Sequence, residues 1–200
     1  MFDRLRSLLR APERKQSRTS RLIAIESGGR ARWTPRDYAA LTREGYTRNA
    51  IVHRAVRLIA ESVGGISFLL QEGAAEHTAH PLLELIARPN PRQDGAAFLE
   101  SVASHLLLAG NAYVEAVSLD DASGASRRLG GEGSASSVRE LYALRPDRMK
   151  VVPGPDGWPL AFDYTVAGHT VRFEQSAPQP PILHLTLFNP LDDYYGLSPL

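Results

Sequence analysis

Residues 94–117 constrain the fold of this chain more than any other stretch, because they combine a helix, an abrupt stop and a strand. Asp94 can accept hydrogen bonds from the free backbone N–H groups at a helix N-terminus. Apolar residues recur at helical spacing over 98–109, and Gly110 stands where a left-handed residue would end the helix. Residues 111–117 then alternate between two faces, as strand residues do. We therefore expect an α/β core element here.

Start and stop signals place further helices in the N-terminal half. Thr34 followed by Pro35 suits the start of a short helix that ends near residue 45. Asn49 is a second candidate N-cap and opens a helix over 50–63, and a short helix is expected over 82–87. In the helix over 50–63, the expected buried positions are Val52, Val56, Ile59 and Val63, and the polar positions off that stripe are Arg54, Arg57 and Glu61.

The C-terminal half changes to β character after a Gly- and Ser-rich surface insertion at 119–137. The turns that follow carry Pro and Gly, which favour the backbone angles of tight turns. Helices that come first and antiparallel strands that come later predict an α+β fold, with the N-terminal helices packed on the strands. Besides the strand over 111–117, strands are expected over 66–71, 138–144, 149–152, 160–166, 170–173 and 182–187, and a loop or hairpin tip over 73–78.

The first 60 residues are strongly basic, although the net charge of the whole chain is only +1. They hold 14 Arg and Lys against 5 Asp and Glu, whereas the remaining 140 hold 9 against 17. Two interpretations stay open: a solvated arm with arginine-rich codon usage, or an arm that contacts nucleic acid or an acidic protein surface. We expect a flexible arm over 1–33 and a folded domain over 34–200. The contact candidates are Arg4, Arg6, Arg10, Arg14, Lys15, Arg18 and Arg21.

Composition and spacing exclude several classes of site. The chain has no cysteine, which excludes disulfides, thiolate metal sites and cysteine nucleophiles. No apolar run approaches the ~18 residues that span a bilayer, so no membrane partner is expected. The absence of an apolar signal segment at the N-terminus favours intracellular synthesis. The glycine-rich segment 130–134 lacks the ending of a phosphate loop and joins no strand to a helix, so it predicts no nucleotide site.

The histidines and acidic pairs give no catalytic constellation. His77 and His80 are three residues apart, but Pro81 marks this run as an ordinary helix entry. His105 lies near an apolar helix face and suits the core, while His184 alternates with leucines in a strand and could point outward. The composition around Asp192 is that of a loop, and no nucleophilic serine stands on a sharp turn. We therefore expect no enzyme, no cofactor and no metal site.

An ordered series of motifs resembles the portal proteins of tailed bacteriophages, of the type found in phages with long non-contractile tails. The segments, in order, are 49–63 (NAIVHRAVRLIAESV), 80–86 (HPLLELI), 89–91 (PNP), 106–114 (LLLAGNAYV), 141–147 (LYALRPD), 182–184 (ILH) and 196–199 (GLSP). The residues that carry the resemblance are Asn49, Pro89, Asn90, Pro91, Gly110, Asn111, Tyr113, Pro146, Asp147, Gly196 and Pro199. The resemblance also fits the portal of a gene transfer agent, a phage-derived DNA-packaging particle.

The resemblance implies a structural subunit and not an enzyme. Portals form rings, commonly of twelve subunits, at one capsid vertex, and they contact the major capsid protein, the large terminase subunit and the head–tail connector. Double-stranded DNA passes through the ring during packaging and ejection. By this resemblance residues 34–200 correspond to the wing region of a portal, made in a bacterial cytoplasm and built into a virion or phage-like particle. The stem, clip and channel parts follow the GLSP motif in the family, so we expect them to be absent from this chain.

Two other functions stay open at this point. One is a stand-alone nucleic-acid-binding module whose basic arm wraps DNA. The other is a small hydrolase that uses His80, Asp94 or Asp192.

Overall fold

The computed structural model describes residues 38–118, 138–176 and 180–200. The expectations for the arm over 1–33, for the helix start at Thr34 and for the insertion at 119–137 lie outside the described residues. The elements are α2 (Tyr38–Ala40), the π-helix η2 (Leu41–Tyr46), α3 (Ala50–Gly64), β1 (Leu70–Glu72), β2 (Ala75–His77), α4 (Pro81–Ala87), α5 (Gly95–Ala109), β3 (Asn111–Ser118), β4 (Val138–Leu144), the 3-10 helix η4 (Pro146–Arg148), β5 (Met149–Pro153), β6 (Pro159–Val166), β7 (His169–Glu174) and β8 (Ile182–Thr186). This order confirms the α+β class.

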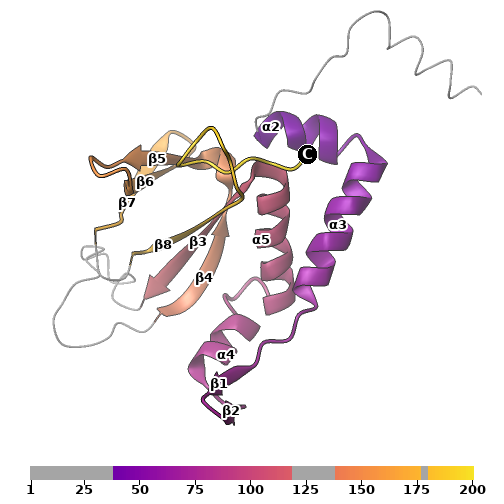
Figure 1. Cartoon of the computed structure of the whole chain (residues 1–200), viewed down its shortest axis with the longest axis vertical. Helices are drawn as coiled ribbons and strands as arrows, with labels where there is room; N and C mark the ends of the chain where they lie inside the picture. Colours follow the sequence, from indigo (N-terminus) through magenta and orange to yellow (C-terminus); the bar gives the residue numbers. More distant parts are fainter. Residues whose placement is uncertain (1–37, 119–137, 177–179) are drawn as a thin grey trace, which may run out of the picture. The chain divides into compact units, whose positions relative to one another are not determined.

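Strand β3 is the centre of the described fold (Figure 1). It lies between β4 and β8 in one antiparallel sheet, while β5, β6 and β7 form a second antiparallel sheet and β1 pairs with β2 in a hairpin. Helix α5 packs against the β3 sheet, and α3 packs against α5. The described elements therefore stack as helices, then the β3 sheet, then the second sheet.

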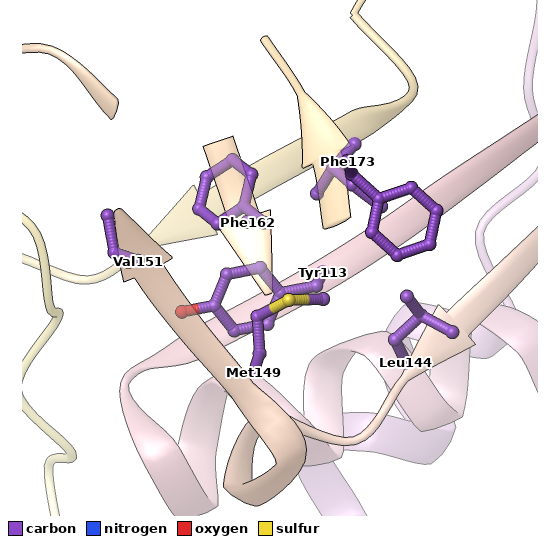
Figure 2. Close-up of a cluster of buried hydrophobic side chains, with 7 residues drawn as sticks. Tyr113, Leu144, Met149, Val151, Phe162 and Phe173 are labelled. Atoms are coloured by element: carbon purple, nitrogen blue, oxygen red, sulfur yellow. The ribbon is translucent and has the colours of Figure 1, made fainter. Parts of the chain in front are cut away.

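The two faces of β3 serve two different hydrophobic clusters. Ala112 and Val114 face α5, where they pack with Phe98 and Val102. Because side chains alternate along a strand, Tyr113 points the other way, into the cluster between the two sheets. Figure 2 shows Tyr113 in that cluster; its other buried members are Leu144, Met149, Val151, Phe162, Phe173 and Ile182. Both faces of β3 are thus buried, as expected of a central strand.

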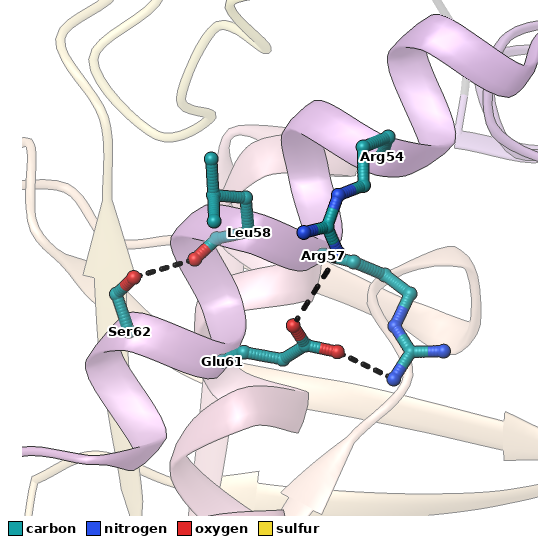
Figure 3. A network of polar contacts seen from close by, with 5 residues as sticks. All are labelled: Arg54, Arg57, Leu58, Glu61 and Ser62. Carbon is teal, nitrogen blue, oxygen red and sulfur yellow. Dashed lines mark hydrogen bonds and ion pairs between the residues drawn. The ribbon is translucent and has the colours of Figure 1, made fainter.

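Helix α3 carries charge on its outward face and is buried through only a narrow stripe. Glu61 accepts a hydrogen bond from Arg57 at 2.5 Å and lies 3.8 Å from an Arg54 nitrogen (Figure 3). These groups are largely exposed, so the pairing contributes little to stability. The expectation that all three lie off the buried stripe is confirmed.

Two expectations are wrong in detail, one about a helix and one about a strand. Ile59 is 49% exposed, and the buried residues of α3 are Val56 and Ala60. The side chain at 60 lies one helical turn after Val56, so the contact stripe follows a small alanine that admits the close approach of α5. The strand expected over 66–71 is reduced to β1, because residues 66–69 find no strand partner in the described fold. Among the described helices, none combines the length and apolar character that crossing a bilayer requires.

Candidate functional site

The joint between α5 and β3 is built on Gly110. Its φ is +73°, a left-handed conformation that ends the helix, and its N–H donates to Leu106 O. A side chain at this position would meet a second obstacle, because its Cβ would lie 2.5 Å from backbone carbons of Gly196 and Leu197. Gly110 is therefore required twice, once for the turn and once for the approach of the C-terminal segment.

Gly196 completes this contact from the other side. A Cβ on Gly196 would collide with the Gly110 carbonyl oxygen, and the same oxygen accepts a hydrogen bond from Leu187 N at 2.8 Å. Ser198 then donates to Leu107 O at 2.8 Å, on the last turn of α5. Two motifs that lie more than eighty residues apart in sequence thus meet backbone to backbone.

Asn111 is the polar centre of the joint and is only 6% exposed. Its Nδ2 donates to Ala109 O at 2.9 Å and to Gly196 O at 3.3 Å, which leaves Oδ1 as the acceptor. Oδ1 accepts from Gly196 N at 2.8 Å and lies 3.0 Å from His184 Nε2. Because Oδ1 is an acceptor, His184 Nε2 must carry the proton of that hydrogen bond.

His184 is held as a neutral ring in this joint. It stacks on Tyr113, with ring centroids 4.3 Å apart and an angle of 12° between the planes. Burial lowers the pKa of His184 to about 4. The expectation that His184 could point outward is therefore wrong: it faces inward because Leu183, its neighbour in β8, takes the exposed side at 57% exposure.

A second polar cluster connects η4 to the N-terminal helices. Arg145 binds Asp147 with two hydrogen bonds, at 3.0 and 2.7 Å. Tyr38 O–H lies 3.3 Å from His105 Nδ1, and burial lowers the pKa of His105 to about 4, with a smaller opposing effect of the Asp147 charge. The core position expected for His105 agrees with this burial. Pro146 opens η4 and so places Asp147 beside the helices.

The PNP motif fixes the other end of α5. Asn90 is 4% exposed, and its Nδ2 donates to Leu141 O at 2.9 Å while Leu141 N donates to Pro89 O at 2.8 Å. Arg92 N donates to Asn90 Oδ1 at 2.9 Å, which turns the chain at Pro91. The LYALRPD segment and the PNP motif are therefore one structural unit.

This unit lines a cavity that we call the arginine pocket, with a volume of about 630 Å³. Arg88 and Arg92 reach it from the PNP turn, and Arg139 reaches it from β4. Within the described residues none of these three arginines has an ion-pair partner. The lining also includes two carboxylates that are already engaged: Asp94 caps α5 and Glu140 accepts from Tyr142 O–H. The pocket therefore presents guanidinium groups that no described carboxylate neutralises, and a carboxylate or a phosphate could bind them.

The remaining predicted side chains have structural contacts. Asn49 caps α3 through Ile51 N and Val52 N, and His80 Nδ1 caps α4 through Leu82 N at 3.1 Å. Asp192 Oδ1 accepts from the N–H groups of the two tyrosines that follow the loop. Pro199 lies between Ser198 and Leu200, which are themselves hydrogen-bonded at 3.2 Å. The seven basic residues proposed for the arm lie outside the described residues.

Neither the arginine pocket nor the Asn111–His184 contact was found from the sequence. Arg88 and Arg92 flank the PNP motif, which was a usable signal, but Arg139 joins them only through the β-sheet. In the part of the chain that is described, no group of three or more His, Asp or Glu side chains is arranged to hold a metal ion.

The sequence profile described as "Phage portal protein" matches residues 50–200. The chain belongs to the phage portal protein family. All the motifs of the portal resemblance lie within that match, apart from Asn49 at its edge, so the resemblance is confirmed.

Solved chains that are similar to this one include chains of gene transfer agent particles. A chain in the neck of an empty GTA particle, computed with C6 symmetry, is 42% identical with a TM-score of 0.72, over 92% of this portal-family chain and 46% of that chain. Chains in the virion of a native gene transfer agent particle and in the neck of a native GTA particle computed with C12 symmetry are each 40% identical. Their TM-scores are 0.65 and 0.66, over 92% of this chain and 44% of theirs.

Curated relatives give a consistent but less informative match. Uncharacterised proteins of Rickettsia bellii (strain RML369-C) and Rickettsia felis (strain ATCC VR-1525 / URRWXCal2) are 30% identical over 161 and 159 residues. The match covers 78% of this portal-family chain and 37% of each relative. The chain thus spans less than half the length of the proteins that it matches.

Proposed function

We propose that this chain is the wing-like region of a portal subunit in a gene transfer agent-like particle. The observation that carries the proposal is the 42% identity, with a TM-score of 0.72, to a chain in a GTA neck over 92% of the present chain. The motifs that make the PNP unit and the Gly110–Gly196 contact support it further, since both build the fold and neither builds a catalytic centre.

The proposed assembly is a ring of twelve subunits at one vertex of the particle. The C6 and C12 symmetries used for the similar neck structures support a cyclic arrangement. In this role the ring contacts the major capsid protein, the large terminase subunit and the head–tail connector, and double-stranded DNA passes through it. The subunit is made in the bacterial cytoplasm, and its task is structural.

Residues 34–200 form the wing-like domain in this proposal, and residues 1–33 form a basic arm. The arm contacts packaged DNA or capsid protein through its arginines, because the first 60 residues hold 14 basic against 5 acidic side chains. Deletion of residues 1–33 should reduce DNA packaging into particles. Normal assembly and normal packaging by the deleted protein would rule out this role of the arm.

Negative-stain electron microscopy of the protein made from its full gene tests the portal function. The expected result is rings with a central opening, and mass photometry should give a mass near twelve subunits. Monomers that bind duplex DNA in a salt-sensitive way would instead support a stand-alone nucleic-acid-binding module.

A further inference from the structure

The loop that follows β8 presents apolar and acidic groups to solvent. We call residues 187–193 the acidic loop: Phe188 is 85% exposed, Leu191 is 94% exposed, and Asp193 has no hydrogen bond or ion pair within the described residues. Two large apolar side chains this exposed lie within four residues of the same loop, and burial against another molecule would remove both from water.

The acidic loop is held in one conformation by its own hydrogen bonds. Asn189 donates to Tyr195 O at 2.7 Å and accepts from Leu191 N at 3.0 Å. Asp192 accepts from Tyr194 N and Tyr195 N at 2.8 and 3.0 Å. Because these contacts order the loop before it binds, little conformational entropy is lost on binding.

A surface of matching chemistry lies at the N-terminal end of α5. Beside the arginine pocket is an apolar pocket of about 460 Å³, and Asp94 lines both. The apolar pocket is lined by Ile66, Phe68, Leu83, Ile86 and Leu99, and its first two members are 56% and 46% exposed. The two pockets together therefore offer an apolar site next to guanidinium groups that have no ion-pair partner among the described residues.

The loop and the two pockets cannot meet within one chain. The acidic loop starts where Leu187 N binds Gly110 O, at the C-terminal end of α5, whereas Asp94 caps the N-terminal end. A helix of 15 residues separates these ends by about 22 Å. The two surfaces differ from each other and are complementary, which is the requirement for a head-to-tail contact that closes a ring.

We propose that the acidic loop of one subunit docks on the arginine pocket and the apolar pocket of a second copy of this chain. Phe188 and Leu191 enter the apolar pocket, and Asp193 pairs with Arg92 and its neighbours. The lining carboxylates Asp94 and Glu140 would repel the closely spaced phosphates of DNA, so a single protein carboxylate fits better. This inference rests on the proposed portal ring.

A charge swap tests this contact. Asp193→Arg and Arg92→Asp are made separately, and self-association is measured by sedimentation velocity over a range of concentrations. Each variant alone sets like charges against each other at every contact, so we expect association at least about tenfold weaker than in the wild type. An equimolar mixture restores opposite charges at every alternate contact and leaves the native pair at the others, so association should return.

Matched controls are Glu76→Arg and Arg43→Asp, which reverse exposed charges outside the loop and the pockets. They should associate as the wild type does. Single variants that associate like the wild type, or a mixture that fails to restore association, would overturn the docking proposal while ring images of the wild type leave the portal function intact. If the wild-type protein made from its full gene stays monomeric and forms no rings, both proposals are contradicted.

Discussion

The two ends of helix α5 differ in how their polar and apolar groups are used. At the C-terminal end, Asn111 engages both atoms of its amide, and two glycines bring the backbones of distant segments into contact. At the N-terminal end, Arg88, Arg92 and Arg139 line a pocket without ion-pair partners in the described residues. The polar groups at the C-terminal end are hydrogen-bonded within the chain and so support the fold. The guanidinium groups at the N-terminal end have no ion-pair partner in the described residues, so another molecule could bind them. Substitutions at the two ends should therefore give opposite phenotypes.

Substitution of Gly110 should give the largest loss of stability. Gly110→Val places a β-branched side chain at φ +73° and drives Cβ into the backbone of Gly196 and Leu197. We expect a loss of more than about 3 kcal/mol in the free energy of unfolding, measured in urea. Gly45→Ala is the matched control, because φ at Gly45 is not left-handed and a Cβ there meets nothing within 4 Å. A Gly110→Val protein as stable as this control would contradict the joint described here.

Removal of the Asn111 amide should lower the free energy of unfolding by less than Gly110→Val does. Asn111→Ala leaves Gly196 N and Ala109 O without their side-chain partner in a buried site, so we expect a loss of about 2–3 kcal/mol. Asn49→Ala, which removes an exposed helix cap, should cost about 1 kcal/mol. Equal losses in the free energy of unfolding for the two substitutions would show that the Asn111 hydrogen bonds stabilise the fold no more than an exposed helix cap does.

Acid should first destabilise the packing at the C-terminal end of α5, where His105 and His184 are buried. Burial lowers the pKa of both His105 and His184 from 6.5 to about 4, so the unfolded chain binds protons more readily than the folded chain. Stability from these groups is complete above about pH 6.5 and is lost as the pH falls towards 4. After allowance for partial solvent screening we expect a loss of about 2 kcal/mol in total. His105→Phe combined with His184→Gln should flatten this pH profile, and an unchanged slope would contradict it.

Charge reversal in the arginine pocket, at the N-terminal end of α5, should have the smallest effect on stability. Arg92→Asp removes no contact of the Arg92 side chain within the described residues, and the backbone bond from Arg92 N to Asn90 persists. The free energy of unfolding should change by less than about 0.5 kcal/mol. A loss comparable with that of Asn111→Ala, measured in the same urea titration, would mean that the pocket supports the fold.

The sequence predicted most of the local structure because its signals are local. Asp94, Gly110 and the alternation of β3 define their element within a few residues, and the Asn49 cap does the same for α3. The errors have nonlocal causes. Ile59 is exposed because α5 contacts α3 along Val56 and Ala60, and residues 66–69 pair with no strand in the described part of the chain.

The candidate site was less accessible from sequence. Gly110 and Gly196, or Arg92 and Arg139, meet only after the sheets form, and no spacing rule connects them. The ordered motif series identified the family before the physical role of each motif was visible.

Hydrogen–deuterium exchange of the wild-type chain at low and high protein concentration is the most direct test of the two roles of α5. In these roles the C-terminal end supports the fold, and the pockets at the N-terminal end bind a second subunit. We expect protection that rises with protein concentration at residues 187–193 and around 66–68 and 88–95, with no change at Gly110 and Asn111. Slow exchange that depends on concentration at the Gly110 joint, with none at the acidic loop or the pockets, would contradict it.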